Sequence, residues 1–456
     1  MVKNIPMSYQ DLLSARLKEL AAGGYMSATE VAGARDLFIR HHQGAPAPVE
    51  WCRVQALSDS GYRAYDTLPE LDGPSLTKAM QKVAVLKLNG GLGTSMGCTG
   101  PKTLIPVKNK MSFLEIIVRQ VSSINTKYGI SMPLLLMNSF NTEKDTKAAL
   151  AQIHLDKPVD ITCFNQAHFP RLDAETLLPC THITPDNQAY WYPPGHGDVL
   201  RSLISESLVD KLIARGVEWI FISSGDNLGA VVDPRIVGYL ATLKGVDFVS
   251  EQTAKTIRDV KGGVLINYDG TTRLLETAQV PQEHMGEFCD ITKFKSFNVN
   301  SIWVRLEALK RLADAGTPID LDIIVNPKVV EGKRVIQLEQ AVGAGITFFK
   351  SEGLLVSRDR FIPVKKTCDL LTVQSDVYDL DSEYVLRACC SIPTVELCAP
   401  LEKMDAYCAA FQCLPSLRGA DTVKILSQCT IGPNVEFRGT CTIDNTSHLE
   451  NCTLGQ

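Results

Sequence analysis

Residues 86–102 read LKLNGGLGTSMGCTGPK. An apolar run that starts at Val83 ends at Leu88, and five glycines then crowd into one loop before Lys102. Glycine lets the backbone take positive φ angles and approach a ligand closely, so successive N–H groups can surround a phosphate. A plain glycine-rich turn is the alternative, but this loop follows a strand and ends in a cation. The stretch therefore predicts a strand that leads into a phosphate-binding loop.

Two familiar phosphate motifs do not fit this loop. A dinucleotide fingerprint that starts at Gly91 needs a glycine where Met96 stands, and a Walker loop needs a glycine where Pro101 precedes Lys102. The loop is therefore a phosphate site of neither common type.

From about residue 80 onward, short apolar runs alternate with amphipathic stretches. Such unbroken apolar strands between helices predict a mostly parallel sheet with both faces covered. Ligands bind at the carboxyl ends of strands in such sheets. The predicted strands are Val83–Leu88, Met132–Met137, Asp160–Phe164 and Trp219–Ser223, and the predicted helices between them are Ser112–Ile124 and Thr142–His154.

The two ends of the chain have other patterns. Leucines three and four residues apart predict a helix over Tyr9–Ala22, which Gly23 ends, and a second helix is predicted over Ala28–His41. Near the C-terminus an apolar residue recurs every six positions, which favours a parallel β-helix over chance spacing in a loop-rich tail. These positions are Ile425, Ile431, Phe437, Ile443 and Leu449.

Composition excludes several classes of protein. The chain has 456 residues, 45% hydrophobic and 21% charged, with a formal net charge of -5, so it lacks the basic surface of a nucleic-acid binder. No apolar run reaches the ~18 residues that a membrane span needs, and the start of the chain has no apolar signal-peptide core. The 14 cysteines include no C-x-x-C pair, which argues against zinc sites and a disulfide scaffold. We therefore expect a cytoplasmic protein with no nucleic-acid or membrane partner.

The loop resembles the nucleotide-binding loop of UDP-glucose pyrophosphorylases of the eukaryotic type. Other segments resemble that family in the same order along the chain, and WYPPGHGD is long and chemically unusual, so the combination is highly specific. These segments are Phe164–Gln166 with Pro170-Arg171, Trp191–Asp198, Asp226–Gly229, Lys261–Gly263, Leu275–Pro281, Phe294–Asn300 and Phe361–Lys365.

The resemblance implies a fold and a domain plan. The expected fold class is α/β, a Rossmann-like nucleotide-sugar transferase with a mostly parallel mixed sheet, followed by a left-handed parallel β-helix. The expected domains are an N-terminal helical region over residues 1–80, a catalytic nucleotidyltransferase domain over 81–400 and a β-helix domain over 401–456. The chain reaches only about five hexapeptide units into that β-helix, so its state is left open between a monomer and a homo-oligomer that forms through this domain.

The implied reaction is the reversible transfer of UMP from UTP to glucose 1-phosphate, which gives UDP-glucose and pyrophosphate. A UDP-N-acetylhexosamine or broad-specificity UDP-sugar pyrophosphorylase is the alternative, but those relatives usually carry an arginine within the segment that is Gly93–Gly97 here. A catalytically silent scaffold is a third hypothesis. It would be expected to have lost Lys102, Asp226 or Lys365, and all three are present.

Chemistry suggests roles for the residues of these segments. Lys102 and Lys365 are the expected catalytic cations, since two anionic reactants must meet and charge builds on the leaving pyrophosphate. Asp226 follows an apolar strand and suits Mg²⁺, with Mn²⁺ as the alternative ion; a turn-capping aspartate is the competing role, and Asp198 is more suited to orienting its own loop. Gln166 can donate and accept at once, which suits the edge of uracil.

By the resemblance, the remaining site residues divide between nucleotide and sugar phosphate. Those that bind the nucleotide are Leu88, Asn89, Gly90, Gly91, Lys102, Gln166, Gly195, Asp226 and Lys365. Those that bind the sugar phosphate are Gly90, Gly91, His196, Ser224, Gly225, Asp226, Glu276, Asn298 and Asn300. A structural histidine is the alternative role for His196.

Overall fold

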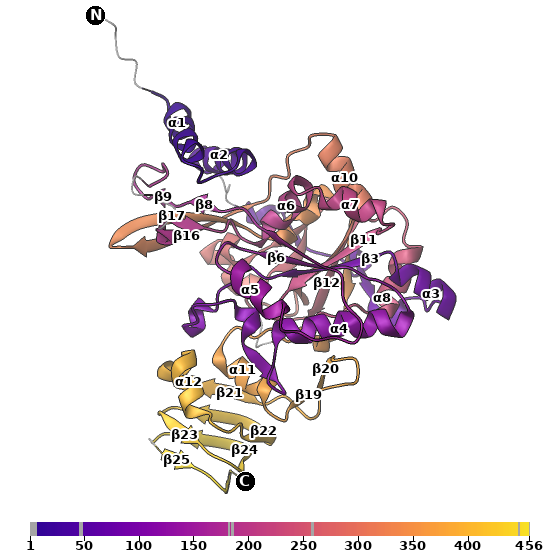
Figure 1. The fold of residues 1–456 in the computed structure, drawn as a ribbon, viewed down its shortest axis with the longest axis vertical. Coiled ribbons are helices and arrows are strands. Elements are labelled where there is room, and N and C mark those ends of the chain that lie inside the picture. The colour runs from indigo at the N-terminus through magenta and orange to yellow at the C-terminus, as the bar shows by residue number, and fades with distance from the viewer. Residues whose placement is uncertain are drawn as a thin grey trace, which may run out of the picture. The chain divides into compact units, whose positions relative to one another are not determined.

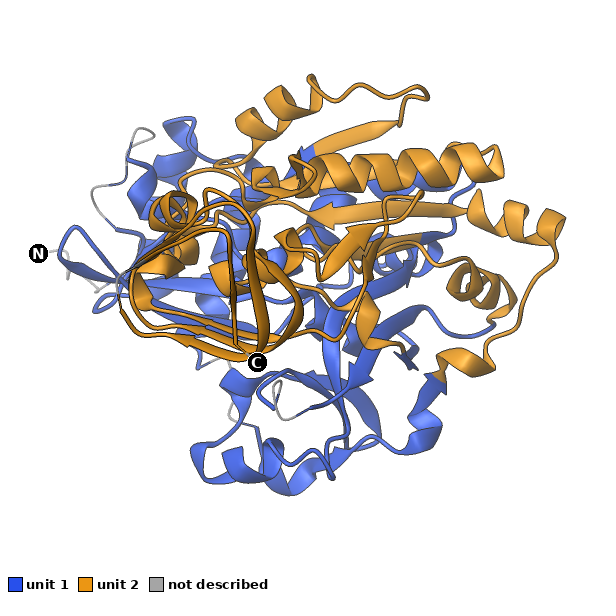
Figure 2. Cartoon of the chain, turned by 90° about the horizontal axis from the view of Figure 1, so that it is seen from below, with its two compact units in different colours: residues 1–63, 164–219, 244–355 blue, residues 64–163, 220–243, 356–456 orange. Residues whose placement is uncertain are grey.

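The computed structural model describes residues 7–44, 49–180, 183, 187–256, 260–445 and 447–455. Figure 1 labels the helices and strands along the chain. The chain forms two compact units, each built from three separate stretches (Figure 2). Unit 1 comprises residues 1–63, 164–219 and 244–355, and unit 2 comprises residues 64–163, 220–243 and 356–456. The domain boundaries expected at residues 80 and 400 stay predictions, and residues 1–6 and 45–48 of the expected helical region lie outside the described residues.

The core of unit 2 is the sheet that contains β3 (Val83–Leu88). Every residue of β3 except the last is buried, and β3 pairs in parallel with β6 (Leu134–Asn138). The strand order around β3 is β11 (Trp219–Ser224), β3, β6 and β7 (Ile161–Asn165). Helix α4 (Phe113–Tyr128) begins at Ser112, whose side chain accepts from the Glu115 N–H, and ends at Gly129 with φ 64°. The predicted parallel pairing of apolar strands is confirmed for β3 and β6.

The remaining elements of unit 2 are shorter. Its helices are α3 (Gly73–Met80), α5 (Glu143–Leu150), α8 (Pro234–Thr242), α11 (Thr367–Gln374) and α12 (Met404–Ala410). Its strands outside the C-terminal tail are β4 (Pro106–Lys108), β5 (Met111–Ser112), β19 (Tyr378–Leu380) and β20 (Leu386–Ala388). The strands β7 (Ile161–Asn165) and β11 (Trp219–Ser224) lie where the chain passes from one unit to the other.

The C-terminal tail of unit 2 forms two small parallel sheets. One has the order β21-β22-β24-β26 and the other pairs β23 with β25. Ile425 pairs with Ile443 and Ile431 with Leu449, so each partner lies about three hexapeptides further along the chain. The six-residue period has a physical basis, because Ile425, Ile431, Phe437 and Ile443 are all buried. The strands are β21 (Thr394–Leu397), β22 (Ser416–Ile425), β23 (Cys429–Ile431), β24 (Val435–Ile443), β25 (Ser447–Leu449) and β26 (Cys452–Leu454).

Unit 1 begins with the two predicted helices. Helices α1 (Tyr9–Ala22) and α2 (Ala28–His42) each start with a capping box, Ser8 with Asp11 and Ser27 with Glu30. Their apolar faces are buried, which confirms the predicted three- and four-residue leucine spacing in α1.

The sheet in unit 1 is mixed. Strand β12 (Phe248–Ala254) pairs in parallel with β18 (Ser351–Leu355) and antiparallel with β15 (Ser296–Arg305). The other helices of this unit are α6 (Val199–Ser205), α7 (Leu208–Ala214), α9 (Met285–Phe288) and α10 (Leu306–Asp314). Its other strands are β1 (Val54–Ala56), β2 (Tyr62–Ala64, at the boundary), β8 (Phe169–Pro170), β9 (Leu172–Asp173), β10 (Trp191–Tyr192), β13 (Val264–Tyr268), β14 (Thr271–Leu275), β16 (Ile323–Val330) and β17 (Lys333–Gln340).

Residues 51–67 differ from the expected helical structure. They form short 3-10 turns and the strands β1 and β2. Strand β1 pairs antiparallel with β13, so Val54 faces Tyr268 from a distant part of the chain. Because the partner is remote in sequence, no local periodicity could have indicated this strand.

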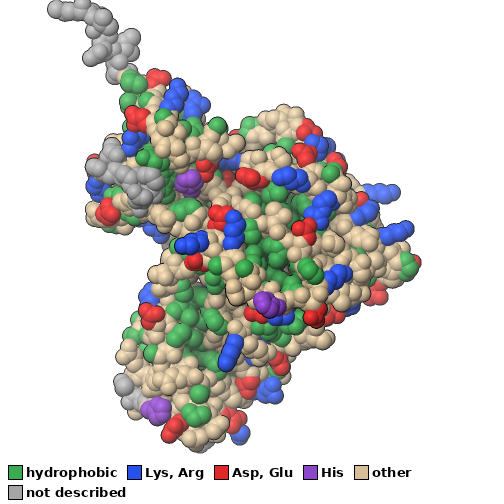
Figure 3. Space-filling view, viewed as in Figure 1, with side chains coloured by type: hydrophobic (Ala, Val, Ile, Leu, Met, Phe, Trp, Pro, Cys, Tyr) green, Lys and Arg blue, Asp and Glu red, His purple; other side chains and the backbone are tan. Residues whose placement is uncertain are grey.

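Charged side chains of both signs are interspersed over the face shown in Figure 3. Among the described residues, no helix is both long and apolar enough to cross a bilayer.

Candidate active site

The predicted phosphate loop is anchored at its base inside unit 2. Asn89, which is 2% exposed, donates to Asn138 Oδ1 at 2.6 Å and to Thr146 Oγ1 at 2.9 Å. Its own Oδ1 accepts from the hydroxyl of Thr103, at the other end of the loop. A single buried amide therefore links both ends of the loop to β6 and α5.

Backbone contacts fix the course of the loop itself. The N–H of Lys102 donates to the Gly91 carbonyl at 3.2 Å, and the Ser139 hydroxyl donates to the Gly90 carbonyl at 2.8 Å. Gly97 has φ 77°, a conformation that favours glycine. The loop is thus closed on itself and tied to the end of β6, as a preorganised anion site requires.

The Asp226 turn lies directly against this loop. The Gly225 N–H donates to the Leu88 carbonyl at 3.1 Å, and a Cβ at position 225 would lie 2.7 Å from the Thr103 methyl. Only glycine allows so close an approach at this point. Lys102 Nζ forms an ion pair with Asp226 Oδ2 at 2.5 Å, and both side chains are partly exposed. Unit 2 therefore places the predicted cation beside the predicted metal ligand, two residues after Ser224 at the end of β11.

A second backbone hydrogen bond holds the segment that carries Lys365 next to Asp226. The Val364 N–H donates to the Asp226 carbonyl at 3.2 Å, and the Lys365 N–H donates to Asp369 Oδ2 at 2.8 Å. Lys365 and its neighbour Lys366 are both exposed. The structure thus brings the backbone of Lys365 next to Asp226, while the role of its ammonium group stays a prediction.

Asp226 fits a metal ion that is carried by a nucleotide. Among the described residues, no group of three or more His, Cys, Asp and Glu side chains could hold a metal ion. Mg²⁺ is usually bound by one or two carboxylates together with water and the phosphates of a substrate. One oxygen of Asp226 is in contact with Lys102, and the other is left as a ligand for such a complex. The residues therefore fit a cation that arrives with a triphosphate.

Sequence reasoning missed Lys403, which precedes α12. Its Nζ donates to the Ser95 carbonyl of the phosphate loop at 3.0 Å, and its side chain packs against Gly97. The two partners are 308 positions apart in the sequence, and no motif marks this lysine. The loop therefore receives support from the C-terminal part of unit 2.

In unit 1, Gln166 follows β7 as predicted for a base-reading amide. It is 7% exposed, and its Oε1 accepts no hydrogen bond from any described residue. Leaving a buried acceptor without a donor costs about 1–3 kcal/mol. A ligand with an N–H group would remove that cost.

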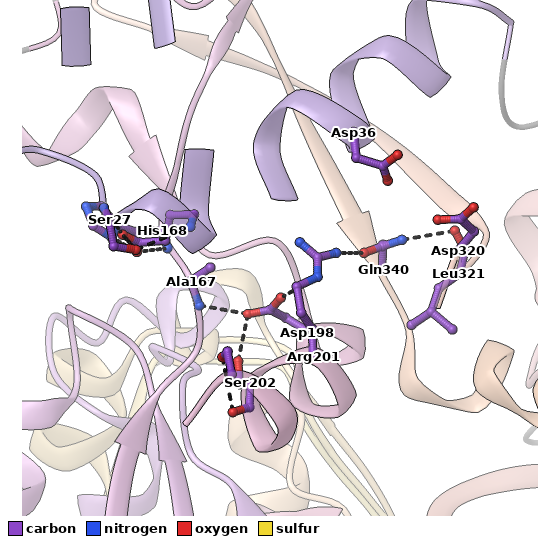
Figure 4. Close-up of polar contacts among 12 residues, drawn as sticks. Ser27, Asp36, Ala167, His168, Asp198, Arg201, Ser202, Asp320, Leu321 and Gln340 are labelled. Atoms are coloured by element: carbon purple, nitrogen blue, oxygen red, sulfur yellow. Dashed lines mark hydrogen bonds and ion pairs between the residues drawn. The ribbon is translucent and has the colours of Figure 1, made fainter. Parts of the chain in front are cut away.

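The backbone after Gln166 is fixed by Asp198 (Figure 4). Asp198 is 1% exposed, and its Oδ2 accepts from the Ala167 N–H at 2.7 Å and from the Ser202 hydroxyl at 3.0 Å. Arg201 lies with Nε 3.7 Å from Asp198 Oδ1 and donates to Gln340 Oε1 at 3.3 Å. Asp198 thus fixes the backbone that follows Gln166, and its role in orienting its own loop stays a prediction.

Gly195 and His196 lie against the end of β17. Gly195 has φ 85°, and a Cβ there would lie 2.6 Å from the Gln340 carbonyl oxygen, so the position requires glycine. The Val342 N–H donates to His196 Nδ1 at 3.2 Å. Since Nδ1 accepts, a neutral ring carries its proton on Nε2, which is then a donor suited to a phosphate oxygen.

The predicted sugar-reading residues are gathered around one backbone segment of unit 1. The Asn300 N–H donates to Asn298 Oδ1 at 3.0 Å, and Asn300 has a left-handed φ of 56°. The Asn298 N–H donates to the Gly263 carbonyl at 2.8 Å, and a Cβ on Gly263 would lie 2.7 Å from a Glu276 carboxylate oxygen. Glu276, Asn298 and Asn300 therefore share one neighbourhood.

Comparisons with known proteins agree over almost the whole chain. A family model described as UTP–glucose-1-phosphate uridylyltransferase matches residues 35–438. The curated enzyme of that name from Hordeum vulgare is 44% identical over 427 residues, which is 92% of this chain and 90% of that protein. The one from Solanum tuberosum is 44% identical over 436 residues, which is 94% and 91% of the two chains.

Comparison with solved structures finds enzymes of the same kind. A mutant UDP-glucose pyrophosphorylase from Leishmania major in complex with UDP-Glc has a TM-score of 0.86 at 29% identity and covers 98% of each chain. A UDP-glucose phosphorylase from Trypanosoma brucei has a TM-score of 0.81 at 30% identity, covering 97% of this chain and 99% of its own. The fold is thus mixed α/β with a parallel-rich central sheet, and the chain belongs to the UTP–glucose-1-phosphate uridylyltransferase family.

Proposed function

We propose that this chain transfers UMP from UTP to glucose 1-phosphate in a reversible, Mg²⁺-dependent reaction that gives UDP-glucose and pyrophosphate. The family match over residues 35–438 carries this proposal. The local geometry supports it, since a closed glycine loop ends in a lysine that contacts a single strand-end carboxylate.

Positioning and electrostatics account for the chemistry. The attacking oxygen of glucose 1-phosphate is already ionised, so in-line attack on the α-phosphorus requires no general base and no covalent intermediate. The loop N–H groups and Lys102 neutralise the triphosphate, and Lys365 bridges the attacking and target phosphates as they approach. His196 donates from Nε2 to the sugar phosphate, while Glu276 and Asn300 hydrogen-bond glucose hydroxyls. Mg²⁺ held by Asp226, with Mn²⁺ as an alternative ion, would neutralise further charge on the phosphates.

Pyrophosphate release from UTP with a panel of sugar 1-phosphates tests the activity. Glucose 1-phosphate should give the highest kcat/KM, above galactose 1-phosphate and N-acetylglucosamine 1-phosphate. A preference for the N-acetylated sugar would instead identify a UDP-N-acetylhexosamine enzyme, and no release with any sugar would contradict the proposal.

The orphaned oxygen of Gln166 gives a prediction about base choice. The N3–H group of uracil donates a hydrogen bond to this oxygen, and the side-chain NH₂ group of Gln166 donates to a neighbouring carbonyl of the base. Gln166→Glu loses that donor and adds a buried charge, so the Kd for UTP should rise by about 100-fold. The Kd for glucose 1-phosphate, measured separately by titration calorimetry, should change little. Equal losses for both ligands would mean that Gln166 is merely structural.

Three wider properties belong to the same proposal. The C-terminal sheets, with partners about three hexapeptides apart, support a left-handed parallel β-helix in residues 401–456. We propose that this domain is the surface through which identical chains assemble, which light scattering of the purified protein would measure. A cytoplasmic location, which fractionation would test, accords with the acidic net charge and the absence of paired cysteine motifs.

A further inference from the structure

Two backbone N–H groups in succession after Gln166 are bound by carboxylates from distant parts of unit 1. The Ala167 N–H donates to Asp198 Oδ2 at 2.7 Å, and the His168 N–H donates to Glu30 Oε1 at 3.2 Å. Glu30 belongs to helix α2, in a region where the sequence showed no chemical motif. It lies 138 positions from His168, so only the fold reveals the contact.

The two carboxylate oxygens of Glu30 bind different partners, Ser27 at the start of α2 and His168 after Gln166. Oε2 accepts from the N–H and the hydroxyl of Ser27, each at 2.8 Å, which completes the capping box of α2. Oε1 accepts from the backbone of His168 and contacts its ring Nδ1 at 2.6 Å. Burial raises the pKa of Glu30. The contacts with His168 and Ser27 lower it by more, so the pKa of the carboxyl group falls to about 2. The carboxylate is therefore ionised at neutral pH.

The ring of His168 is fixed from both sides. Its Nε2 lies 2.9 Å from the Tyr25 carbonyl oxygen, and the ring contacts Trp191 in a tilted arrangement with the centroids 4.9 Å apart. Each ring nitrogen thus lies within hydrogen-bond distance of an oxygen atom, which fixes the orientation of the ring. His168 thus joins the α1–α2 connection, the start of α2 and the backbone next to Gln166.

Helix α2 has a second contact with the same network. A Cβ on Gly33 would lie 2.1 Å from Arg201 NH1, so the guanidinium group lies directly against this position of α2. Arg201 in turn lies between Asp198 and Gln340, the residues that hold the loops of Gln166 and Gly195 (Figure 4). One face of α2 therefore lies against the supports of both predicted base-binding segments.

We propose that Glu30 is a positioning residue for uracil recognition, which it supports by fixing His168 and thereby the direction of the Gln166 amide. The proposal rests on the proposed function, since it assumes that Gln166 binds the base of UTP. Gln166 Oε1 accepts no hydrogen bond from a described residue, so the position of the neighbouring backbone contributes to the direction in which the amide points. A displaced amide would weaken binding of the base without changing the phosphate chemistry.

The test compares Glu30→Ala with Asp11→Ala in the full-length protein. Asp11 completes the capping box of α1 with Ser8, as Glu30 does for α2, and its hydrogen bonds with Ser8 lie within that box. Glu30→Ala should raise the Kd for UTP about tenfold in titration calorimetry, with kcat at saturating UTP within about threefold of wild type. It should also raise the kcat/KM for CTP relative to UTP, because a loosened amide discriminates less well between the two bases. Asp11→Ala should change none of these quantities.

The conservative variant Glu30→Gln keeps an acceptor for the His168 N–H and should recover most of the UTP affinity. If circular dichroism shows that Glu30→Ala is unfolded, Glu30→Gln and His168→Asn carry the test, and His168→Asn should raise the Kd for UTP with kcat unchanged. Should wild type bind no UTP, the proposed function fails and this inference with it. Should wild type bind UTP while Glu30→Ala stays within twofold of it, or while Asp11→Ala loses as much, only the positioning role of Glu30 is overturned.

Discussion

Replacing Asp226 with asparagine should lower kcat/KM by about a thousandfold, the largest effect that we expect from a single neutral replacement in unit 2. Asparagine keeps the shape of the side chain but removes its charge. It therefore loses the 2.5 Å contact with Lys102 and the carboxylate charge beside the phosphate loop, next to the segment that carries Lys365. Added Mg²⁺ should not restore the activity, because the variant lacks the charged ligand rather than the ion.

Metal binding gives a second measurement that does not depend on turnover. Titration of the enzyme–UTP complex with Mn²⁺, followed by electron paramagnetic resonance, should show at least about tenfold weaker binding in Asp226→Asn. Asp145→Asn is the matched control, since its carboxylate lies near Gly100 of the same loop, and it should behave as wild type. Lost activity with unchanged Mn²⁺ affinity would mean that Asp226 only orients Lys102 and that the metal ligand lies elsewhere.

Local sequence patterns were sufficient for the elements whose cause is local. The apolar run of β3 and the leucine spacing of α1 each depend on side chains within a few positions, and both elements begin and end where the pattern predicts. Where an element ends because of packing, its observed end differs from the predicted one. The helix predicted over Thr142–His154 spans only Glu143–Leu150 in the structure. Beyond Leu150 the residues Ala151, Gln152 and His154 are exposed, so little buried apolar surface favours a longer helix.

The features that the sequence analysis did not predict all depend on contacts between residues that are distant in the chain. Glu30 reaches His168, and Lys403 reaches Ser95, through contacts that no spacing rule contains. Strand β1 has the same origin, since Val54 finds its partner in β13. A motif identifies the side chains that meet a ligand, but the supports that aim those side chains come from wherever the fold places a suitable carboxylate or ammonium group.

Lys365→Ala should lower kcat by about 100- to 1,000-fold while the KM for UTP changes by less than about threefold. A cation between the attacking and target phosphates acts more strongly in the transition state than in either ground state, because the two groups are closest there. Lys102→Ala should instead raise the KM for UTP and lower kcat together, since its loop holds the triphosphate before the reaction begins. Lys365→Arg should recover little, because a planar guanidinium cannot replace a compact ammonium between two phosphates.

Lys366 supplies the matched control for this prediction. It is adjacent and also exposed, and its Nζ lies 3.8 Å from Glu402 Oε1. Lys366→Ala should therefore keep kcat within about twofold of wild type, because exposed ion pairs of this kind contribute little. Steady-state kinetics of the four variants separate the roles. If Lys365→Ala and Lys366→Ala both kept wild-type kcat, Lys365 would be a surface charge, and Lys102 alone would have to neutralise the charge that grows during transfer.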